Sequence, residues 1–172
     1  MRVLAAARIT HVVGIPDNAS APLFDSLSGS PSIELVTVTR EGEAFAIASG
    51  LWLGGAAPLV VIQNTGLLES GDSLRGTAIR MAAPIPILIT GRGYEKMAAA
   101  GLTPDEPRTS ALLTRPDVDS TALFTEPTLA AWGIPFERCS EDGDPAATLE
   151  RAINAARSNE QPTAAVIARA LN

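Results

Sequence analysis

Short apolar runs alternate along the chain with segments that have helical spacing. β-branched and aliphatic runs predict strands at residues 10–15, 33–39, 59–62 and 84–90, and shorter ones at 136–139 and 163–168. Apolar residues at three- and four-residue steps, together with caps and stops, predict helices at 2–8, 21–27, 40–54, 67–82 and 120–131, and from residue 145 onward. Residues 95–119 are polar and proline-rich, which predicts a loop with fragments of helix. This alternation predicts an α/β fold: a single three-layer domain with a mainly parallel sheet of about six strands flanked by helices.

The stretch from residue 33 to residue 50 joins a predicted strand to a predicted helix. One face of that helix is expected to be buried, formed by Ala44, Ile47, Ala48, Leu51 and Trp52. Glu41 lies at the junction, and in open α/β sheets ligands bind outside the carboxyl ends of the strands. Glu41 and Glu43 are also typical of acidic first-turn residues that the helix dipole favours. The local pattern by itself favours this second interpretation.

Composition narrows the class of protein. The chain has 172 residues, of which 46% are hydrophobic and 19% charged, so it is long and apolar enough for one globular domain. A net charge of -6 argues against nucleic acid or an anionic membrane surface as the main partner. The single cysteine, Cys139, allows no internal disulfide and fits a reducing compartment. No apolar run approaches the length of about 20 residues that a membrane span needs. We therefore expect a cytoplasmic protein without a cleavable signal.

Several kinds of catalytic site find no support in the sequence. One histidine (His11) and one cysteine cannot form a soft-ligand metal cluster, so we expect no metal ligands in this chain. There is no G-x-S-x-G elbow, no Walker loop and no G-x-G-x-x-G. His11 lies on a predicted strand, and Trp52 and Trp132 lie on helical faces, so all three are expected to pack in the core.

Polar residues do follow the predicted strands, at the point where each strand ends: Asp17, Asn18, Glu41, Gln63, Asn64 and Arg92. Each could simply serve a turn, because turns commonly use Asp and Asn. Since the carboxyl ends of parallel strands meet at one edge of a sheet, the set predicts a cleft for a small polar ligand. It contains no nucleophile and no metal-ligand set. A reaction that needs a nucleophile or a metal ion would therefore require a cofactor or a partner.

Three segments resemble a known family. They are Gly14-Ile-Pro-Asp-Asn18, Thr39-Arg-Glu-Gly-Glu-Ala44 and Pro58-Leu-Val-Val-Ile-Gln-Asn-Thr-Gly-Leu67. Together they resemble the pyrimidine-binding domain of thiamine diphosphate-dependent 2-oxo acid decarboxylases, most closely the phosphonopyruvate decarboxylase group and the separate α subunit of sulfopyruvate decarboxylase. The resemblance runs from about residue 9 to residue 93 and, more loosely, through Thr128-Leu-Ala-Ala-Trp-Gly-Ile-Pro135.

The resemblance implies roles for the residues at the strand ends. The family's glutamate corresponds to Glu41, because Gly50 lies nine residues further on. The carboxyl group of Glu41 would form a hydrogen bond with the aminopyrimidine ring of the cofactor. This would favour the imino tautomer, whose nitrogen takes the thiazolium proton. A proton-handling catalytic role falls to Asp17. The cofactor would also meet Gly14, Pro16, Gln63 and Asn64, and the substrate would meet Asn18, Asn64 and Arg92.

The substrate that the resemblance implies is a three-carbon 2-oxo acid with a second anionic group, a sulfonate or a phosphonate. Arg75, Arg80, Arg92 and Lys96 could bind that group, and each is also explained as a solvated surface cation. Arg92 is preferred because it follows a predicted strand. Gly42-Glu43 after Glu41 departs from the family pattern and leaves the substrate subgroup open.

The family's second domain has no counterpart here. That domain holds the diphosphate and Mg²⁺ through Gly-Asp-Gly and a later pair of asparagines, whereas Glu141-Asp-Gly-Asp144 leads into Pro145. We therefore expect residues 1–172 to be one pyrimidine-binding domain that works with a diphosphate-domain β-type subunit in a hetero-oligomer, with a homodimer as the alternative for the isolated chain. Three alternatives stay open: a non-catalytic interaction module, a small nucleotide- or sugar-phosphate-binding domain, and another thiamine diphosphate reaction such as carboligation or oxidation.

Overall fold

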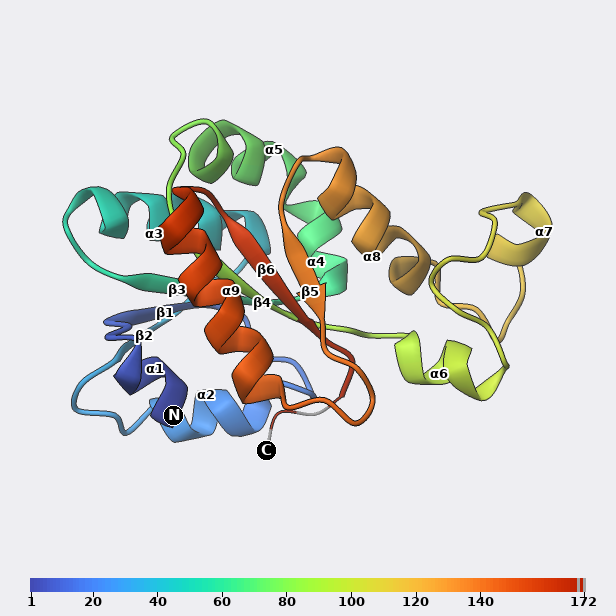
Figure 1. Cartoon of the computed structure of the whole chain (residues 1–172), viewed down its shortest axis with the longest axis horizontal. Coiled ribbons are helices and arrows are strands. Elements are labelled where there is room, and N and C mark those ends of the chain that lie inside the picture. Colours follow the sequence, from blue (N-terminus) through green and yellow to red (C-terminus); the bar gives the residue numbers. More distant parts are fainter. Residues whose placement is uncertain (170, 172) are drawn as a thin grey trace.

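The computed structural model describes residues 1–169 and 171, which fold around one parallel sheet (Figure 1). Its six strands run in the order β2-β1-β3-β4-β6-β5, and every neighbouring pair is parallel. The strands are β1 (His11–Gly14), β2 (Glu34–Thr37), β3 (Pro58–Gln63), β4 (Pro86–Thr90), β5 (Phe136–Arg138) and β6 (Thr163–Ile167). This arrangement confirms the predicted α/β fold with a six-stranded sheet.

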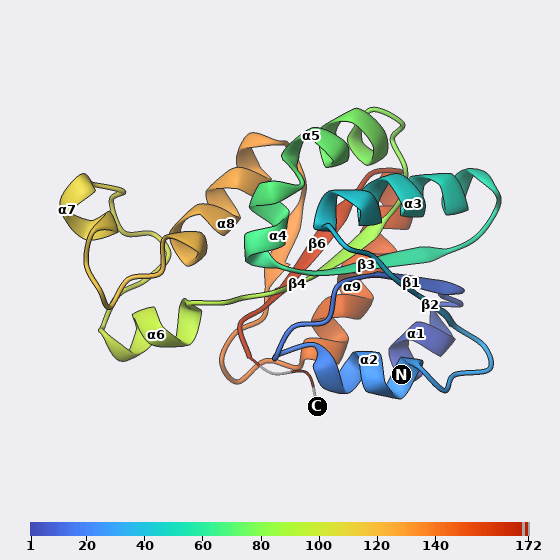
Figure 2. The same ribbon diagram turned by 180° about the vertical axis from the view of Figure 1, so that it is seen from behind.

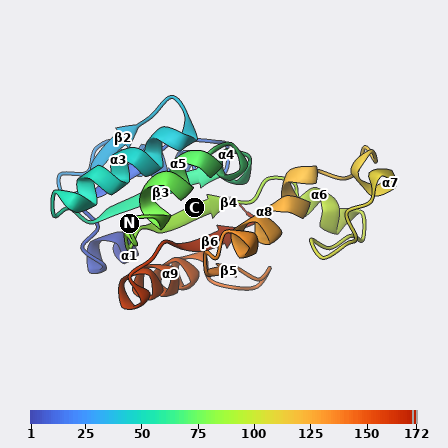
Figure 3. The same ribbon diagram turned by 90° about the horizontal axis from the view of Figure 1, so that it is seen from above.

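Helices cover both faces of the sheet (Figure 3). On one face lie α1 (Arg2–Ala6), α2 (Ala21–Leu27) and α9 (Pro145–Asn159), and on the other lie α3 (Glu41–Leu53), α4 (Asn64–Glu69), α5 (Gly71–Leu74), the π-helical turn Arg75–Ile79 and α8 (Ser120–Ala131). Successive strand residues supply the two cores alternately. In β1, Val12 belongs to the core that also contains residues of α1, α2 and α9, and Val13 belongs to the core that contains residues of α3. Strands buried on both faces explain the continuous apolar runs in the sequence.

Two predicted helices need correction. Ile47 was expected to be buried, but its side chain is 38% exposed, and the buried positions of α3 are Ala44, Phe45, Ala48 and Ser49. Because α3 is apolar on all sides, its pattern could not fix which face turns inward. The helix predicted at 67–82 begins at residue 64 and breaks at Ser70. There the hydroxyl group of Ser70 donates to the Gly66 carbonyl at 2.5 Å, a local bond that often bends helices.

The proline-rich region carries α6 (Tyr94–Ala99) and α7 (Ser110–Leu113), as the sequence predicted. Both helices extend from the β4 end of the sheet, away from the layers (Figures 1 and 2). Trp52 and Trp132 lie against the core but are only partly buried, and His11 is likewise partly exposed at the start of β1. Among the described residues, no helix has the length and apolar character that crossing a membrane requires.

The chain changes direction across the sheet between β1 and β3. From β1 it goes outward to the edge strand β2, and it then returns past β1 to form β3. The loops that follow β1 and β3 consequently leave the sheet in opposite directions. Crevices at such a point bind ligands in open α/β sheets. The segments after β1, β2, β3 and β4 all lie along this one edge of the sheet. They carry the predicted site residues, except that Gly14 is the last residue of β1 and Gln63 is the last residue of β3.

Candidate functional site

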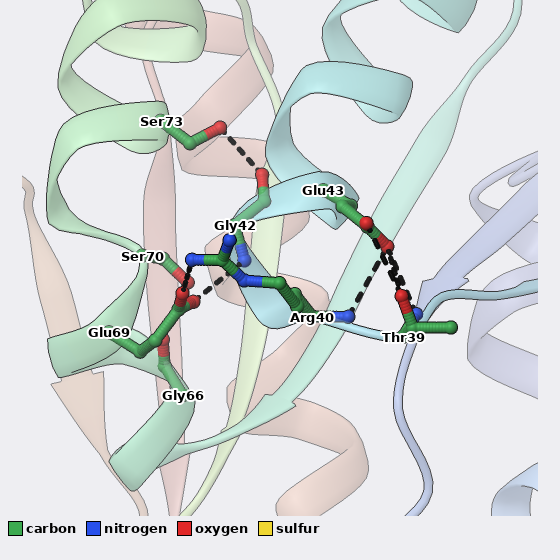
Figure 4. A network of polar contacts seen from close by, with 8 residues as sticks. All are labelled: Thr39, Arg40, Gly42, Glu43, Gly66, Glu69, Ser70 and Ser73. Atoms are coloured by element: carbon green, nitrogen blue, oxygen red, sulfur yellow. Dashed lines mark hydrogen bonds and ion pairs between the residues drawn. The ribbon is translucent and has the colours of Figure 1, made fainter.

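The helix that carries Glu41 begins at the edge of the sheet just after β2. Glu43 caps this helix: its carboxylate accepts hydrogen bonds from the backbone N–H groups of Thr39 at 3.0 Å and Arg40 at 3.2 Å (Figure 4). These bonds lower the pKa of Glu43, which favours the charged form next to the helix dipole. The interpretation as a first-turn acid therefore suffices for Glu43.

Glu41 has different surroundings. Its side chain lies against Gly66 in α4, where a Cβ atom on residue 66 would come within 2.2 Å of Glu41 Cγ and 2.6 Å of Glu41 Oε1. The Glu41 carboxyl can therefore lie in this position only because residue 66 is a glycine and has no side chain. Within the described residues, no hydrogen bond or ion pair engages that carboxylate, which is partly exposed. Its oxygens are thus available to a ligand.

Asp17 ties together the ends of three strands. One carboxylate oxygen accepts from the hydroxyl group and the backbone N–H of Ser20, at 2.5 and 2.7 Å. The other accepts from the Gln63 amide at 2.9 Å and the Thr90 hydroxyl at 2.7 Å. Burial favours the protonated form of Asp17, but these bonds outweigh it and lower the pKa below its ordinary value. The contacts support a role in holding β1, β3 and β4 together, and the predicted proton-handling role stays a prediction.

Asn64 is fully buried and holds the loop after β4. Its amide nitrogen donates to the Arg92 carbonyl at 2.9 Å and to the Thr125 hydroxyl at 3.2 Å, while its amide oxygen accepts from the Arg92 N–H at 3.0 Å. Both ends of the amide are thus engaged with protein. The structure gives Asn64 a positioning role toward Arg92, and the predicted contact with cofactor or substrate stays a prediction.

A cavity of about 570 Å³ lies at this edge of the sheet. Four of the predicted site residues line it: Asp17, Asn18, Gln63 and Arg92. Arg92 is 62% exposed, and its Nε lies 3.3 Å from the Asp119 carboxylate. Its other N–H groups therefore remain available to an anion. Glu41, Gly14, Pro16 and Asn64 are not among the lining residues, so the predicted set divides between this cavity, the start of α3 and the strand framework.

Sequence reasoning missed one cation of the cavity. Arg169 also lines it, and its guanidinium donates to the carbonyl oxygens of Glu141 and Gly143. Carbonyl partners orient this group without cancelling its charge. A second cavity of about 740 Å³ shares Glu95, Ala168 and Arg169 with the first and continues toward Arg138. Arg169 follows the last strand. The search for polar residues at the ends of strands would have found it had that search included β6.

Gly14 and Pro16 belong to the turn that follows β1. Gly14 is buried beside β3, where a Cβ atom would lie 1.8 Å from the carbonyl oxygen of Val61. No other residue fits at so close an approach of two backbones. Pro16 is exposed and sets the turn that leads to Asp17. Their predicted contacts with a cofactor stay predictions.

Comparison with known proteins identifies the family of this fold. Residues 1–101 match the family described as thiamine pyrophosphate enzyme, N-terminal TPP binding domain. The chain belongs to this family. The matched region contains every residue of the predicted site. Thiamine pyrophosphate, which the family is named for, is another name for thiamine diphosphate, the cofactor that the sequence resemblance implied.

The relatives of this thiamine pyrophosphate-binding domain are decarboxylases. It is 34% identical to phosphonopyruvate decarboxylase of Streptomyces viridochromogenes over 90 residues, which make up 52% of this chain and 23% of that protein. It is 30% identical to sulfopyruvate decarboxylase subunit alpha of Methanothermobacter thermautotrophicus over 89 residues, or 52% of this chain and 54% of that subunit. The match thus spans about half of one curated relative and less than a quarter of the other.

A solved structure shows the same fold. The benzoylformate decarboxylase from Polynucleobacter necessarius superimposes with a TM-score of 0.65 at 18% identity, over 99% of this chain and 30% of that one. Within the thiamine pyrophosphate-binding domain, the family's cofactor can be tested against the residues present. The Glu41 carboxylate has no partner among the described residues and lies in a recess that Gly66 keeps open, which fits a ligand with a hydrogen-bonding ring nitrogen. The Glu41–Gly66 arrangement therefore fits an aminopyrimidine.

Proposed function

We propose that this chain is the pyrimidine-binding, α-type component of a thiamine diphosphate-dependent 2-oxo acid decarboxylase, with Glu41 as the residue that activates the cofactor. The observation that carries the proposal is the Glu41 carboxylate resting on Gly66, inside the region that matches the family. Kinship with decarboxylases at about one-third identity supports the reaction type. When bound, thiamine diphosphate supplies the carbon nucleophile and the electron sink that decarboxylation requires.

In this proposal, Glu41 shares a proton with a nitrogen atom of the pyrimidine ring. A carboxyl group on the first residue of α3 can do this because, in the part of the chain that the structure describes, no hydrogen bond or ion pair engages its oxygens. Closure of the site by a cofactor ring and a second domain would remove water from the carboxylate, which favours the shared proton. Asp17, Gln63 and Thr90 would keep the edge of the sheet rigid beneath the reacting groups.

The second half of the site would come from a partner chain. Residues 1–172 contain neither the Gly-Asp-Gly nor the asparagine pair of the diphosphate domain. In this proposal, Mg²⁺ and the diphosphate would be held by a β-type subunit. Two relatives, from Methanothermobacter thermautotrophicus and Methanococcus maripaludis, are named as a subunit alpha, which supports an assembly of this kind. We therefore infer a hetero-oligomer, and its location in the cytoplasm stays a prediction.

The proposed substrate is sulfopyruvate or phosphonopyruvate. Both carry a carboxylate and a second anionic group on three carbons. The cavity at the sheet edge offers Arg92 and Arg169 for these anions and Asn18 for a neutral hydrogen bond. Arg92 is the proposed partner of the sulfonate or phosphonate, because its exposed guanidinium keeps free donors.

The test is decarboxylation of both acids in the presence of thiamine diphosphate and Mg²⁺. Activity is measured for this chain alone, for this chain with its diphosphate-domain partner, and for the same pair carrying Glu41→Gln. We expect activity only in the pair, and a loss of at least about 100-fold in Glu41→Gln, as is typical when an acid–base group is removed. Glu43→Gln is the matched control, because its amide can still cap α3. An inactive pair that still assembles would point instead to an interaction module.

A further inference from the structure

The first turn of α3 is held by a residue from another helix. The backbone N–H of Gly42 donates to Glu69 Oε2 at 3.1 Å, and Glu69 is the last residue of α4 (Figure 4). On the other side of Gly42, its carbonyl accepts from the Ser73 hydroxyl at 2.5 Å. The N–H in question belongs to the peptide that joins Glu41 to Gly42. The peptide next to the proposed catalytic carboxyl is therefore fixed to α4.

This contact gives the Gly42 N–H group an acceptor that the side chain of the N-cap residue cannot supply. Arg40 is the N-cap residue of α3, and its guanidinium offers only donors, so it cannot accept from the first N–H groups of the helix. Instead, Arg40 Nη2 donates to Glu69 Oε1 at 2.5 Å. That bond lowers the pKa of Glu69 and so keeps its carboxylate charged. A charged acceptor on a helix N–H makes a stronger hydrogen bond than a neutral one.

Gly66 and Glu69 act from the same helix. They are three residues apart in α4, a spacing that puts them on one side of a helix. Gly66 provides the recess for the Glu41 side chain, and Glu69 holds the peptide that follows Glu41. Two consecutive residues of α3 thus meet two residues on one side of α4. A change at Glu69 would move the start of α3 relative to that recess.

We propose that Glu69 is a positioning residue for Glu41, which it keeps over Gly66 by holding the Gly42 peptide. This inference rests on the proposed function of Glu41 and extends it to a residue outside the predicted site. The partly exposed ion pair with Arg40 is secondary, since exposed pairs contribute little by themselves. The bond to the backbone N–H carries the effect. The expected consequence of losing it is a misplaced carboxyl in a domain that stays folded.

The test uses Glu69→Met, which keeps the length of the side chain and removes both acceptors. Glu69→Gln keeps one acceptor, and Asp72→Asn is the matched control, because Asp72 is an exposed carboxylate nearby that pairs with Arg75. Amide hydrogen exchange of Gly42 is followed by NMR in this chain without partner or cofactor. We expect exchange at least about 10-fold faster in Glu69→Met, an intermediate rate in Glu69→Gln and no change in Asp72→Asn. Unchanged exchange in Glu69→Met overturns the proposal.

Kinetics of the assembled enzyme separate this inference from the proposed function. In Glu69→Met we expect kcat to fall about 10- to 100-fold with KM for the 2-oxo acid nearly constant, because misplacement of a reacting group acts on the chemical step. If Glu41→Gln is inactive but Glu69→Met is fully active, the positioning role fails and the proposed function stands. If both variants are fully active, the proposed function fails and takes the positioning role with it.

Discussion

The carboxyl group of Glu41 occupies the space in which any side chain at residue 66 would have to lie. The distance of 2.2 Å from a Cβ on Gly66 to Glu41 Cγ is far shorter than two unbonded carbon atoms allow. The glycine of the Gln63-Asn-Thr-Gly66 segment and the glutamate that follows β2 are therefore two parts of one feature. The glycine leaves room for the glutamate side chain, although 25 positions of the sequence separate them.

Gly66→Ala should displace Glu41 and leave the fold intact. The new methyl group forces either the carboxyl or the start of α3 to move, so we expect decarboxylation by the assembled enzyme to fall about 100-fold, the effect of a misplacement near 1 Å. Overpacking should also lower the free energy of unfolding by about 1–3 kcal/mol. Steady-state kinetics and urea unfolding measure the two effects. Gly76→Ala, where a Cβ meets no atom within 4 Å, is the control and should leave activity unchanged.

Asp17→Asn should destabilise the domain. An asparagine presents one amide NH₂ group toward donors that now face a carboxylate, so at least one hydrogen bond from Ser20, Gln63 or Thr90 is lost. We expect the free energy of unfolding to fall by about 1–3 kcal/mol at pH 7. Urea unfolding followed by circular dichroism checks this. A variant as stable as the wild type would show that these bonds do not hold the three strands together.

The same carboxylate should make stability depend on pH. Hydrogen bonds outweigh burial and lower the pKa of Asp17 below its ordinary value of 3.8. The unfolded chain therefore binds the proton first as the pH falls. The stabilising effect is complete above about pH 5 and is lost as the pH drops through the lower, folded-state pKa. The difference in stability between wild type and Asp17→Asn should accordingly shrink between pH 5 and pH 3. A gap that widens on acidification would contradict the assigned shift.

Asn64→Asp should loosen the loop that carries Arg92. Aspartate can still accept from the Arg92 N–H, but it cannot donate to the Arg92 carbonyl or to Thr125. A buried carboxylate facing a carbonyl oxygen should lower the free energy of unfolding by about 2–3 kcal/mol. Thr125→Val removes the longest of the three contacts together with the hydrogen bond from the Thr125 hydroxyl to the Thr121 carbonyl, and we expect a smaller loss. Thermal unfolding of the two variants provides the comparison, and equal losses would refute the proposed hold on Arg92.

Arg92→Met should weaken substrate binding more than it slows the reaction. The exposed guanidinium is the proposed partner of the sulfonate or phosphonate, and a hydrogen bond to a charged group contributes about 1.5–3 kcal/mol. We therefore expect KM to rise about 10- to 100-fold with kcat little changed. Arg75→Met is the control, since Arg75 lies on the π-helical turn and pairs with Asp72. A fall in kcat at constant KM would instead assign Arg92 to the chemical step.

Most of the fold could be predicted from the sequence because its signals are local. Six short apolar runs became the six strands, and the helices at 21–27 and 120–131 have the predicted bounds. Asp144 caps α9, as expected for an aspartate before a proline: its side chain accepts from the Ala146 N–H at 2.9 Å. Such features depend on a few neighbouring residues. They hold wherever the segment lies in the molecule.

Local patterns in the sequence did not predict two features of the helices correctly. In α3 the sequence is apolar on every side, so the exposure of Ile47 depends on where the sheet lies and not on the helix itself. The break at Ser70 depends on a hydrogen bond from the Ser70 hydroxyl to a carbonyl of its own helix, which not every serine in a helix forms. The structure, and not the pattern, decided both.

The sequence by itself determined which residues gather at the carboxyl edge of the sheet, because parallel strands bring their ends together. Only the tertiary structure decided how those residues divide the work. It buried Asn64 against Arg92 and placed Asp17 in hydrogen-bonding contact with residues as far along the chain as Thr90. Among residues 1–169 and 171 it gave the Glu41 carboxylate no hydrogen-bond or ion-pair partner. It also brought Glu69 to Gly42, which no spacing in the sequence indicates. Contacts between distant residues depend on the packing of whole helices, and that packing is fixed only when the two cores are filled.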